Sequence, residues 1–208
     1  MAVENTTGGP YEPLAEVYEE YTQDILLGQP FDRAMMAAFA ELVGDGTVLD
    51  AGCGPGYATD HLSGLGVTAK GVDQSPEMIR LATKAYPELD FSVGDIADLD
   101  EEDGALAGVL ARYSTIHMEP EDVALAVREF HRVTIEGGYV LISFQSDTEG
   151  TVPTAFDHRV AQAYRWPVDA MAELLRSEGF AETARLIRVP KEDERGFPQA
   201  HLLVCKEG

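Results

Sequence analysis

Apolar residues recur every three to four positions in two stretches of residues 11–44. Gly28 and Pro30 interrupt the pattern between them, because neither residue suits the interior of a helix. The spacing predicts two helices, which we interpret as a helical cap over residues 1–44.

After Gly44 the pattern changes to short apolar runs that alternate with amphipathic stretches. Short apolar runs bounded by turn residues indicate buried strands, and the amphipathic stretches indicate helices. Strands that alternate with helices build a mainly parallel sheet with helices on both faces. The predicted strands are 47–49, 67–72, 89–93, 108–111 and 139–144, and the helices between them are 58–65, 75–86 and 120–133.

The C-terminal part breaks this alternation. A predicted helix over 168–178 leads into a strand over 184–189, and a short acidic loop separates that strand from another over 200–205. Two strands this close in sequence pair antiparallel. The pattern predicts a doubly wound α/β fold of about seven strands that ends in an antiparallel hairpin. We assign residues 45–208 to this domain. Within it, residues 146–167 form a polar and aromatic insertion, which we interpret as a loop.

The composition is that of an ordinary globular chain. Its 208 residues, 45% of them hydrophobic, fit one domain of about 100–200 residues. No apolar run approaches the roughly 20 residues that span a bilayer, and the N-terminus lacks the pattern of a secretion signal. Cys53 and Cys205 are far apart, so we expect neither a disulfide nor a metal site. These features favour a cytoplasmic protein.

The charge is strongly negative. Thirty-seven acidic residues against 15 Lys and Arg residues give a formal net charge of −22. This charge repels phosphate backbones and anionic lipids, so we expect neither nucleic-acid nor membrane binding. It also keeps the protein soluble, which is the simplest explanation for it.

The segment from Thr47 to Gly56 joins a predicted strand to a predicted helix through a turn with glycine at every second position. Such a turn lets a ligand approach the backbone, because no Cβ is in the way. It departs from the dinucleotide fingerprint, whose third glycine would fall at Tyr57. Asp50 at the strand end would oppose a pyrophosphate but suits a ligand with an ammonium group. A tight turn without a ligand is the structural alternative.

Two further acids follow the next two strands. Asp73 ends the second strand, where nucleotide-binding sheets place the acid that accepts the ribose hydroxyls. Asp95, in the segment Gly94-Asp95-Ile96, ends the third strand and can bind the adenine edge. Each has a structural alternative, as a helix cap or a turn residue. Because parallel strands end at one edge of a sheet, the three acids together predict a single ligand site.

These motifs resemble those of the class I S-adenosylmethionine-dependent methyltransferases. Residues 48–56 match the first motif of that superfamily without gaps, Asp73 matches its ribose acid and residues 94–96 its adenine motif. Residues 130–138 resemble its turn before the fifth strand, although Glu136 replaces the usual proline. The resemblance covers roughly residues 45–145, and the flanks resemble small bacterial enzymes that act on small molecules. It implies a Rossmann-like sheet of order 3-2-1-4-5-7-6, S-adenosylmethionine as cofactor, S-adenosylhomocysteine as product and no metal.

The resemblance also assigns roles by position. The methionine moiety would lie by the glycine turn and the adenosine by the second and third strands, with the segment before the first strand as a lid. The implied cofactor residues are Tyr18, Tyr21, Asp50, Gly52, Cys53, Gly54, Asp73, Gln74, Met78, Gly94, Asp95, Ile96 and Arg112. Tyr18 and Tyr21 fit equally well as residues that pack an amphipathic helix.

Catalytic candidates lie after the fourth strand, where that edge of the sheet faces the reacting sulfonium. His117 titrates near neutrality and Tyr113 is close by in sequence, so both are candidate catalytic residues. A histidine bonded to backbone at a helix start is the alternative for His117. The candidate substrate-binding residues are Tyr57, Tyr113, His117, His158, Tyr164 and Trp166, of which Trp166 also fits as an anchor for the next helix.

These observations predict transfer of a methyl group to an oxygen, nitrogen or carbon atom of a small metabolite. The expected partner is that acceptor alone, bound by a monomer or a homodimer. Two alternatives stay open. One is a non-catalytic protein that binds S-adenosylmethionine. The other is a nicotinamide-dependent reductase, which the missing glycine at position 57 disfavours.

Overall fold

The computed structural model describes residues 26–158, 160–192 and 194–208. The predicted helix over residues 11–25, including Tyr18 and Tyr21, lies outside them. The elements are α2 (Pro30–Val43), β1 (Thr47–Ala51), α3 (Tyr57–Gly64), β2 (Thr68–Asp73), α4 (Pro76–Ala85), β3 (Asp90–Val93), β4 (Leu106–Arg112), α5 (Pro120–Val133), β5 (Thr134–Asp147), β6 (Thr154–Asp157), β7 (Gln162–Pro167), α6 (Val168–Ser177), β8 (Phe180–Arg188) and β9 (Gln199–Lys206).

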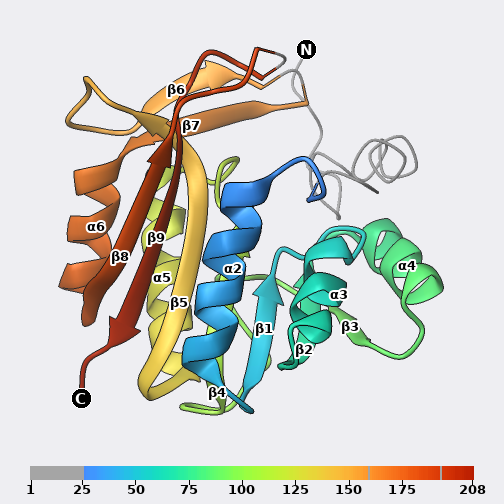
Figure 1. Ribbon diagram of the computed structural model, residues 1–208. Helices are drawn as coiled ribbons and strands as arrows, with labels where there is room; N and C mark the ends of the chain where they lie inside the picture. Colours follow the sequence, from blue (N-terminus) through green and yellow to red (C-terminus); the bar gives the residue numbers. More distant parts are fainter. Residues whose placement is uncertain (1–25, 159, 193) are drawn as a thin grey trace.

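The central sheet has the predicted strand order. β3, β2, β1, β4 and β5 are neighbours in that order, and all of these pairs are parallel. β9 lies antiparallel between β5 and β8 (Figure 1). Since β8 and β9 are the sixth and seventh strands of the prediction, the order 3-2-1-4-5-7-6 and the antiparallel hairpin are confirmed.

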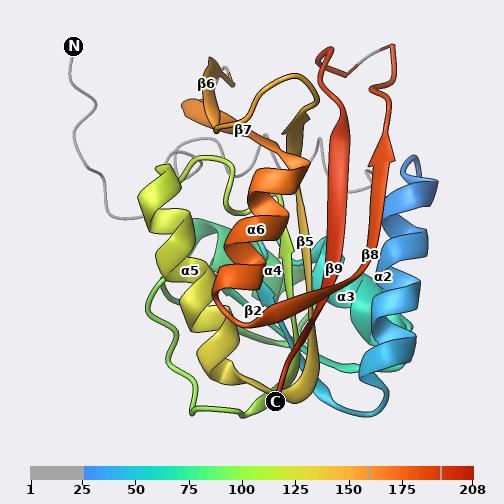
Figure 2. The same cartoon turned by 90° about the vertical axis from the view of Figure 1, so that its left-hand side faces the viewer.

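Neighbouring strand residues point to opposite faces of the sheet and pack in two separate clusters. Val48 packs with α2 and α3, whereas Leu49 packs with α5, because side chains alternate along a strand. Helices therefore cover both faces, with α2 on one side and α5 and α6 on the other (Figure 2). No helix within the described residues is long and apolar enough to cross a membrane.

The insertion 146–167 is not the loop that its polar composition indicates. It contains the hairpin of β6 and β7, at the top of Figure 1, with Phe156 paired to Ala163. β5 also extends beyond the predicted 139–144 and runs to Asp147. β9 pairs with β5 as far as Gln145. Beyond that residue, Ser146 and Asp147 of β5 pair in parallel with β7. The hairpin forms because the protruding end of β5 offers unpaired backbone groups to a second partner.

Candidate functional site

The three acids singled out in the sequence follow strands that are neighbours in the sheet. Asp50 lies in β1 opposite Gly71 of β2, and Asp73 ends β2 opposite Val93 of β3. Asp95 follows β3 by two residues. The parallel register brings all three to the carboxyl edge of the sheet, where doubly wound folds bind their ligands.

The glycine turn between β1 and α3 has one side that faces open space. Gly52, Gly54 and Gly56 all have positive φ angles, of 80°, 53° and 87°, which favour glycine. A Cβ at Gly52 would lie 2.2 Å from Ser114 Cβ, and one at Gly56 would lie 2.8 Å from Phe91 Cζ. A Cβ at Gly54 would meet no atom within 4 Å. A ligand can therefore approach the backbone at Gly54.

The amides of the turn are already used within the protein. Gly52 and Cys53 both donate to the carbonyl of Val72 in β2, at 2.8 and 2.9 Å. Gly54 N donates to Asp73 Oδ2 at 2.9 Å, and Ser75 N donates to Asp73 Oδ1 at 2.9 Å. Asp73 thus ties the turn to the start of α4. Capping of α4 falls to Ser75, as predicted, because its Oγ accepts from Met78 N at 3.1 Å.

Asp50 is buried beneath the turn. Its side chain is 1% exposed, and Oδ2 accepts a 2.7 Å hydrogen bond from the Thr59 hydroxyl on α3. Burial raises the pKa of Asp50 to about 7, against the lowering effects of Thr59 and Arg112. This carboxyl group therefore changes its charge near neutral pH.

The candidates near the ends of β2 and β3 differ in their exposure. Asp95 is exposed, and its Oδ1 accepts from Ala97 N at 2.9 Å. Gln74 is exposed as well, whereas Met78 and Ile96 are buried. Asp95 and Gln74 are thus accessible to a ligand, whereas Met78 and Ile96 are packed inside the protein.

Arg112 joins the end of β4 to two helices. Its Nη1 donates to Tyr57 Oη at the start of α3, and its Nη2 pairs with Asp32 Oδ2 in α2, both at 2.9 Å. The Arg112 side chain is 7% exposed. Arg112 and Tyr57 therefore lie together at the carboxyl edge of the sheet, where Tyr57 follows the glycine turn directly and Arg112 ends β4, but the partner Asp32 was not predicted.

Asp32 belongs to a buried polar cluster that sequence reasoning missed. Ser143 Oγ lies 2.8 Å from His201 Nδ1, and His201 Nε2 lies 3.4 Å from Asp32 Oδ1. Arg188 pairs with Glu194 at 2.6 and 2.8 Å. The only sequence signal was one polar residue in each of the apolar runs 140–144 and 200–205.

Tyr113 has an unusual backbone and an unpaired hydroxyl. Its φ is 55°, and all other residues with a positive φ in the described part of the chain are glycines. Its hydroxyl is buried and has no hydrogen-bond partner in the described part of the chain, and burial raises its pKa. Strain of this kind concentrates at functional sites, which supports Tyr113 as a candidate.

His117, His158 and Tyr164 come together where the loop after β4 meets the hairpin. The rings of His117 and His158 are 5.0 Å apart, and Tyr164 N donates to Ile116 O at 2.8 Å. His117 Nδ1 lies 2.8 Å from the carbonyl of Gln162. A carbonyl only accepts, so Nδ1 carries the proton and the neutral ring has its lone pair at Nε2. Burial lowers the pKa of His117, which favours this neutral form.

Trp166 packs in the core rather than at the surface of the hairpin. It is 5% exposed and shares a cluster with Val168 and Met171 of α6. This position agrees with the role of an anchor for α6, although its buried Nε1 has no partner among the described residues.

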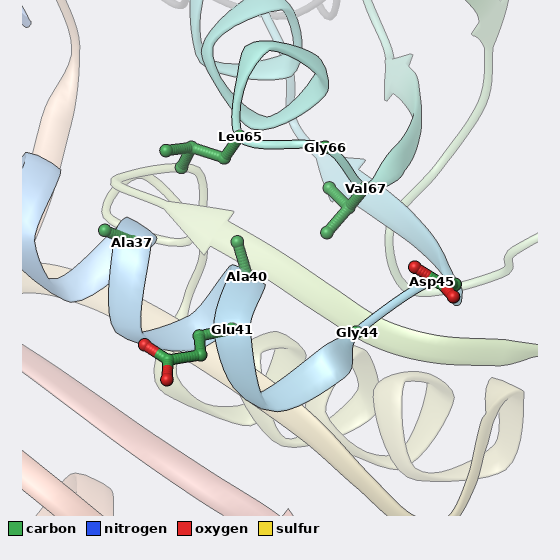
Figure 3. A pocket seen from close by; sticks show the side chains of 8 residues that line it. All are labelled: Ala37, Ala40, Glu41, Gly44, Asp45, Leu65, Gly66 and Val67. Atoms are coloured by element: carbon green, nitrogen blue, oxygen red, sulfur yellow. The ribbon is translucent and has the colours of Figure 1, made fainter.

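One hollow of the surface lies away from these residues. It has a volume of about 420 Å³ and lies between α2 and the turn before β2, lined by Ala37, Glu41, Leu65 and Val67 among others (Figure 3). These residues precede β1 and β2, so the hollow lies at the amino edge of the sheet. We assign no function to it.

The strand order, with three acids at the carboxyl edge of the sheet, is the arrangement in which nucleotide-binding α/β sheets hold their ligands. Residues 48–138 match the family model of the methyltransferase domain. The chain is 35% identical over 97 residues to a malonyl-[acyl-carrier protein] O-methyltransferase of Erwinia billingiae, a match that covers 46% of the chain and 38% of that relative. Residues 48–138 therefore match a methyltransferase domain, and the motifs at 48–56, Asp73 and 94–96 are similar to those of the class I S-adenosylmethionine-dependent methyltransferases.

Solved structures agree with this assignment at the level of the fold. A Burkholderia thailandensis 1,6-didemethyltoxoflavin-N1-methyltransferase, solved with S-adenosylhomocysteine, is similar with a TM-score of 0.70 and 21% identity, over 99% of this chain and 94% of that one. The [4+2]-cyclase SpnF is similar with a TM-score of 0.73 and 19% identity, over 84% and 80%. The same fold therefore carries more than one kind of chemistry.

Proposed function

We propose that this protein transfers a methyl group from S-adenosylmethionine to an oxygen, nitrogen or carbon atom of a small metabolite and releases S-adenosylhomocysteine. The main support is the convergence of Asp50, Asp73 and Asp95 on three adjacent strand ends, around a turn that is open at Gly54. An acceptor of low molecular weight agrees with the net charge of −22, which opposes nucleic acid.

The residues present fit this cofactor. Asp73 would accept the ribose hydroxyls, Asp95 would bind the adenine edge, and Asp50 would face the ammonium group through the turn. The open side at Gly54 leaves room for the methionine moiety. Of the remaining predicted cofactor residues, Gly52, Cys53, Gln74, Gly94 and Ile96 closely follow the ends of β1, β2 or β3, whereas Met78 lies in α4 and Arg112 ends β4. No group of three or more possible metal ligands occurs within the described residues.

The bound cofactor supplies an electrophilic methyl group on a sulfonium. The protein aligns the acceptor with that methyl group and excludes water. Where the acceptor carries a proton, His117 would take it at Nε2, since Nδ1 is held by the Gln162 carbonyl. Tyr113, Tyr57, His158 and Tyr164 would line the acceptor side. Cys53 and Cys205 are both free thiols, which agrees with action in the cytoplasm.

Titration calorimetry with S-adenosylmethionine, S-adenosylhomocysteine and NADH tests the proposal. We expect heat from the first two ligands and none from NADH. No heat from either sulfur ligand would refute the proposal, and heat from NADH alone would favour the reductase. Release of S-adenosylhomocysteine during incubation with a panel of small metabolites then separates an enzyme from a non-catalytic binding protein.

A further inference from the structure

Four buried polar atoms without hydrogen-bond partners in the described residues belong to one cluster. They are Asp32 Oδ1, His201 Nε2, Arg188 Nε and Tyr113 Oη. Asp32 Oδ1 lies 3.4 Å from His201 Nε2 and 4.0 Å from Arg188 Nε. The Tyr113 and His201 rings are 6.4 Å apart. Buried polar groups are rarely left unpaired, because each one costs about 1–3 kcal/mol.

This cluster, which we call the polar subsite, adjoins the glycine turn. Tyr113 follows Arg112 at the end of β4 and precedes Ser114, whose Cβ is the atom that excludes a side chain at Gly52. The segment 112–114 thus separates the cofactor turn from the polar subsite. A methyl acceptor has to lie next to the cofactor, so a group held at the polar subsite would meet this requirement if the methionine moiety lies at the glycine turn.

Both arginines at the polar subsite already have anionic partners. Asp32 pairs with Arg112, and Arg188 pairs with Glu194, so neither guanidinium is without a carboxylate. Burial opposes the charge of Asp32, but its contacts with His201 and Arg112 lower its pKa to about 2, so it stays ionised. A bound anion would meet the carboxylate of Asp32, and a bound cation would meet Arg188. Either charge would be buried without a counterion.

We propose that the polar subsite binds a neutral group of the methyl acceptor that carries a hydrogen-bond donor beside an acceptor, such as a carboxamide or a lactam. Its N–H would donate to Asp32 Oδ1, and its carbonyl would accept from Arg188 Nε and from the Tyr113 hydroxyl. This inference rests on the proposed methyl transfer, and it adds the chemical class of the acceptor.

Three small probes built on one benzene ring test the charge preference. Benzamide, benzoate and benzylamine share a ring and differ in whether the polar end is neutral, anionic or cationic. Their affinities are measured by ligand-observed NMR titration of the protein saturated with S-adenosylhomocysteine. We expect benzamide to bind at least about tenfold more tightly than the other two, because burial of an unpaired charge is unfavourable. Equal or tighter binding of benzoate or benzylamine, or no binding of benzamide, would overturn the inference.

The variant Tyr113→Phe tests the position of the ligand. It removes a hydroxyl that has no partner in the described residues, so the thermal midpoint should stay level or rise. Benzamide affinity should fall about fivefold, the loss expected from one neutral hydrogen bond. Tyr139→Phe is the matched control, because Tyr139 lies on β5 opposite Gly108, toward the other edge of the sheet.

Two results separate the possible failures. A lower thermal midpoint in Tyr113→Phe, with unchanged benzamide binding, would show that a bound water rather than the acceptor satisfies the hydroxyl. Binding of S-adenosylhomocysteine is measured on the same samples. If it binds and benzamide does not, only the polar subsite is refuted, whereas no binding of S-adenosylhomocysteine refutes the proposed function itself.

Discussion

Asp73 Oδ2 lies 2.9 Å from the backbone nitrogen of Gly54, so the acid at the end of β2 holds the one glycine of the turn that faces open space. The same carboxylate accepts from Ser75 N at the start of α4. One side chain thereby sets the distance between the methionine and ribose ends of the proposed cofactor site.

Replacement of Asp73 should weaken cofactor binding. In Asp73→Ala the ribose hydroxyls lose their acceptor and the Gly54 amide loses its partner, so the binding free energy of S-adenosylhomocysteine should fall by about 1–3 kcal/mol. Calorimetry measures the change. Asp100→Ala, which removes an exposed acid, is the control for the lost charge. Wild-type affinity in Asp73→Ala would remove Asp73 from the site.

Alanine at Gly52 and at Gly54 should have different effects. Both residues have positive φ, which costs an alanine about 1–2 kcal/mol in either case. Gly52→Ala also places a Cβ 2.2 Å from Ser114 Cβ, so it should lower the free energy of unfolding further. Gly54→Ala should lower it less and should instead weaken S-adenosylhomocysteine binding, because its Cβ enters the open space.

Chemical denaturation of both variants measures the free energy of unfolding, and calorimetry measures their affinity for S-adenosylhomocysteine. If Gly54→Ala keeps wild-type affinity for S-adenosylhomocysteine, the open side of the turn does not face the cofactor.

Asp50 should make the stability of the free protein depend on pH. Its pKa rises from 3.8 to about 7 on folding, so between these values the folded state holds a proton that the unfolded chain has released. The free energy of unfolding should therefore decrease as the pH rises from about 4 to 7. In Asp50→Asn the decrease should be smaller, because the amide carbonyl still accepts from Thr59 but does not titrate. Denaturant unfolding across this pH range measures both slopes, and equal slopes would contradict the raised pKa.

The features that sequence patterns predicted correctly are local ones. The helix predicted over 120–133 is α5, Pro120–Val133, with unchanged bounds, and Ser75 caps α4. Strand periodicity also predicted the parallel sheet, because each run of apolar residues corresponds to one strand between two layers of helices. The carboxyl end of β3 agrees with the predicted position 93, whereas β1 and β2 continue two residues and one residue further than predicted.

The features that were missed depend on contacts between distant parts of the chain. Asp32 and Arg112 are 80 residues apart, and Ser143 and His201 are 58 apart. No local periodicity links such pairs, so only the folded sheet shows that they meet. The hairpin of β6 and β7 was missed for a similar reason, since it forms on the exposed end of β5 and not from a strong strand pattern of its own.

His117 should affect methyl transfer and not cofactor binding. Its Nδ1 faces the Gln162 carbonyl, so in the neutral ring Nε2 is the atom that accepts a proton. With an acceptor that loses a proton, His117→Ala should lower the rate of S-adenosylhomocysteine release by about 100-fold or more, the usual contribution of a general base. Affinity for S-adenosylhomocysteine should stay at the wild-type value. The wild-type rate should fall at acid pH with an apparent pKa below the ordinary histidine value, because burial lowers the pKa of His117. An unchanged rate in the variant would mean that His117 only joins the loop after β4 to the β7 strand.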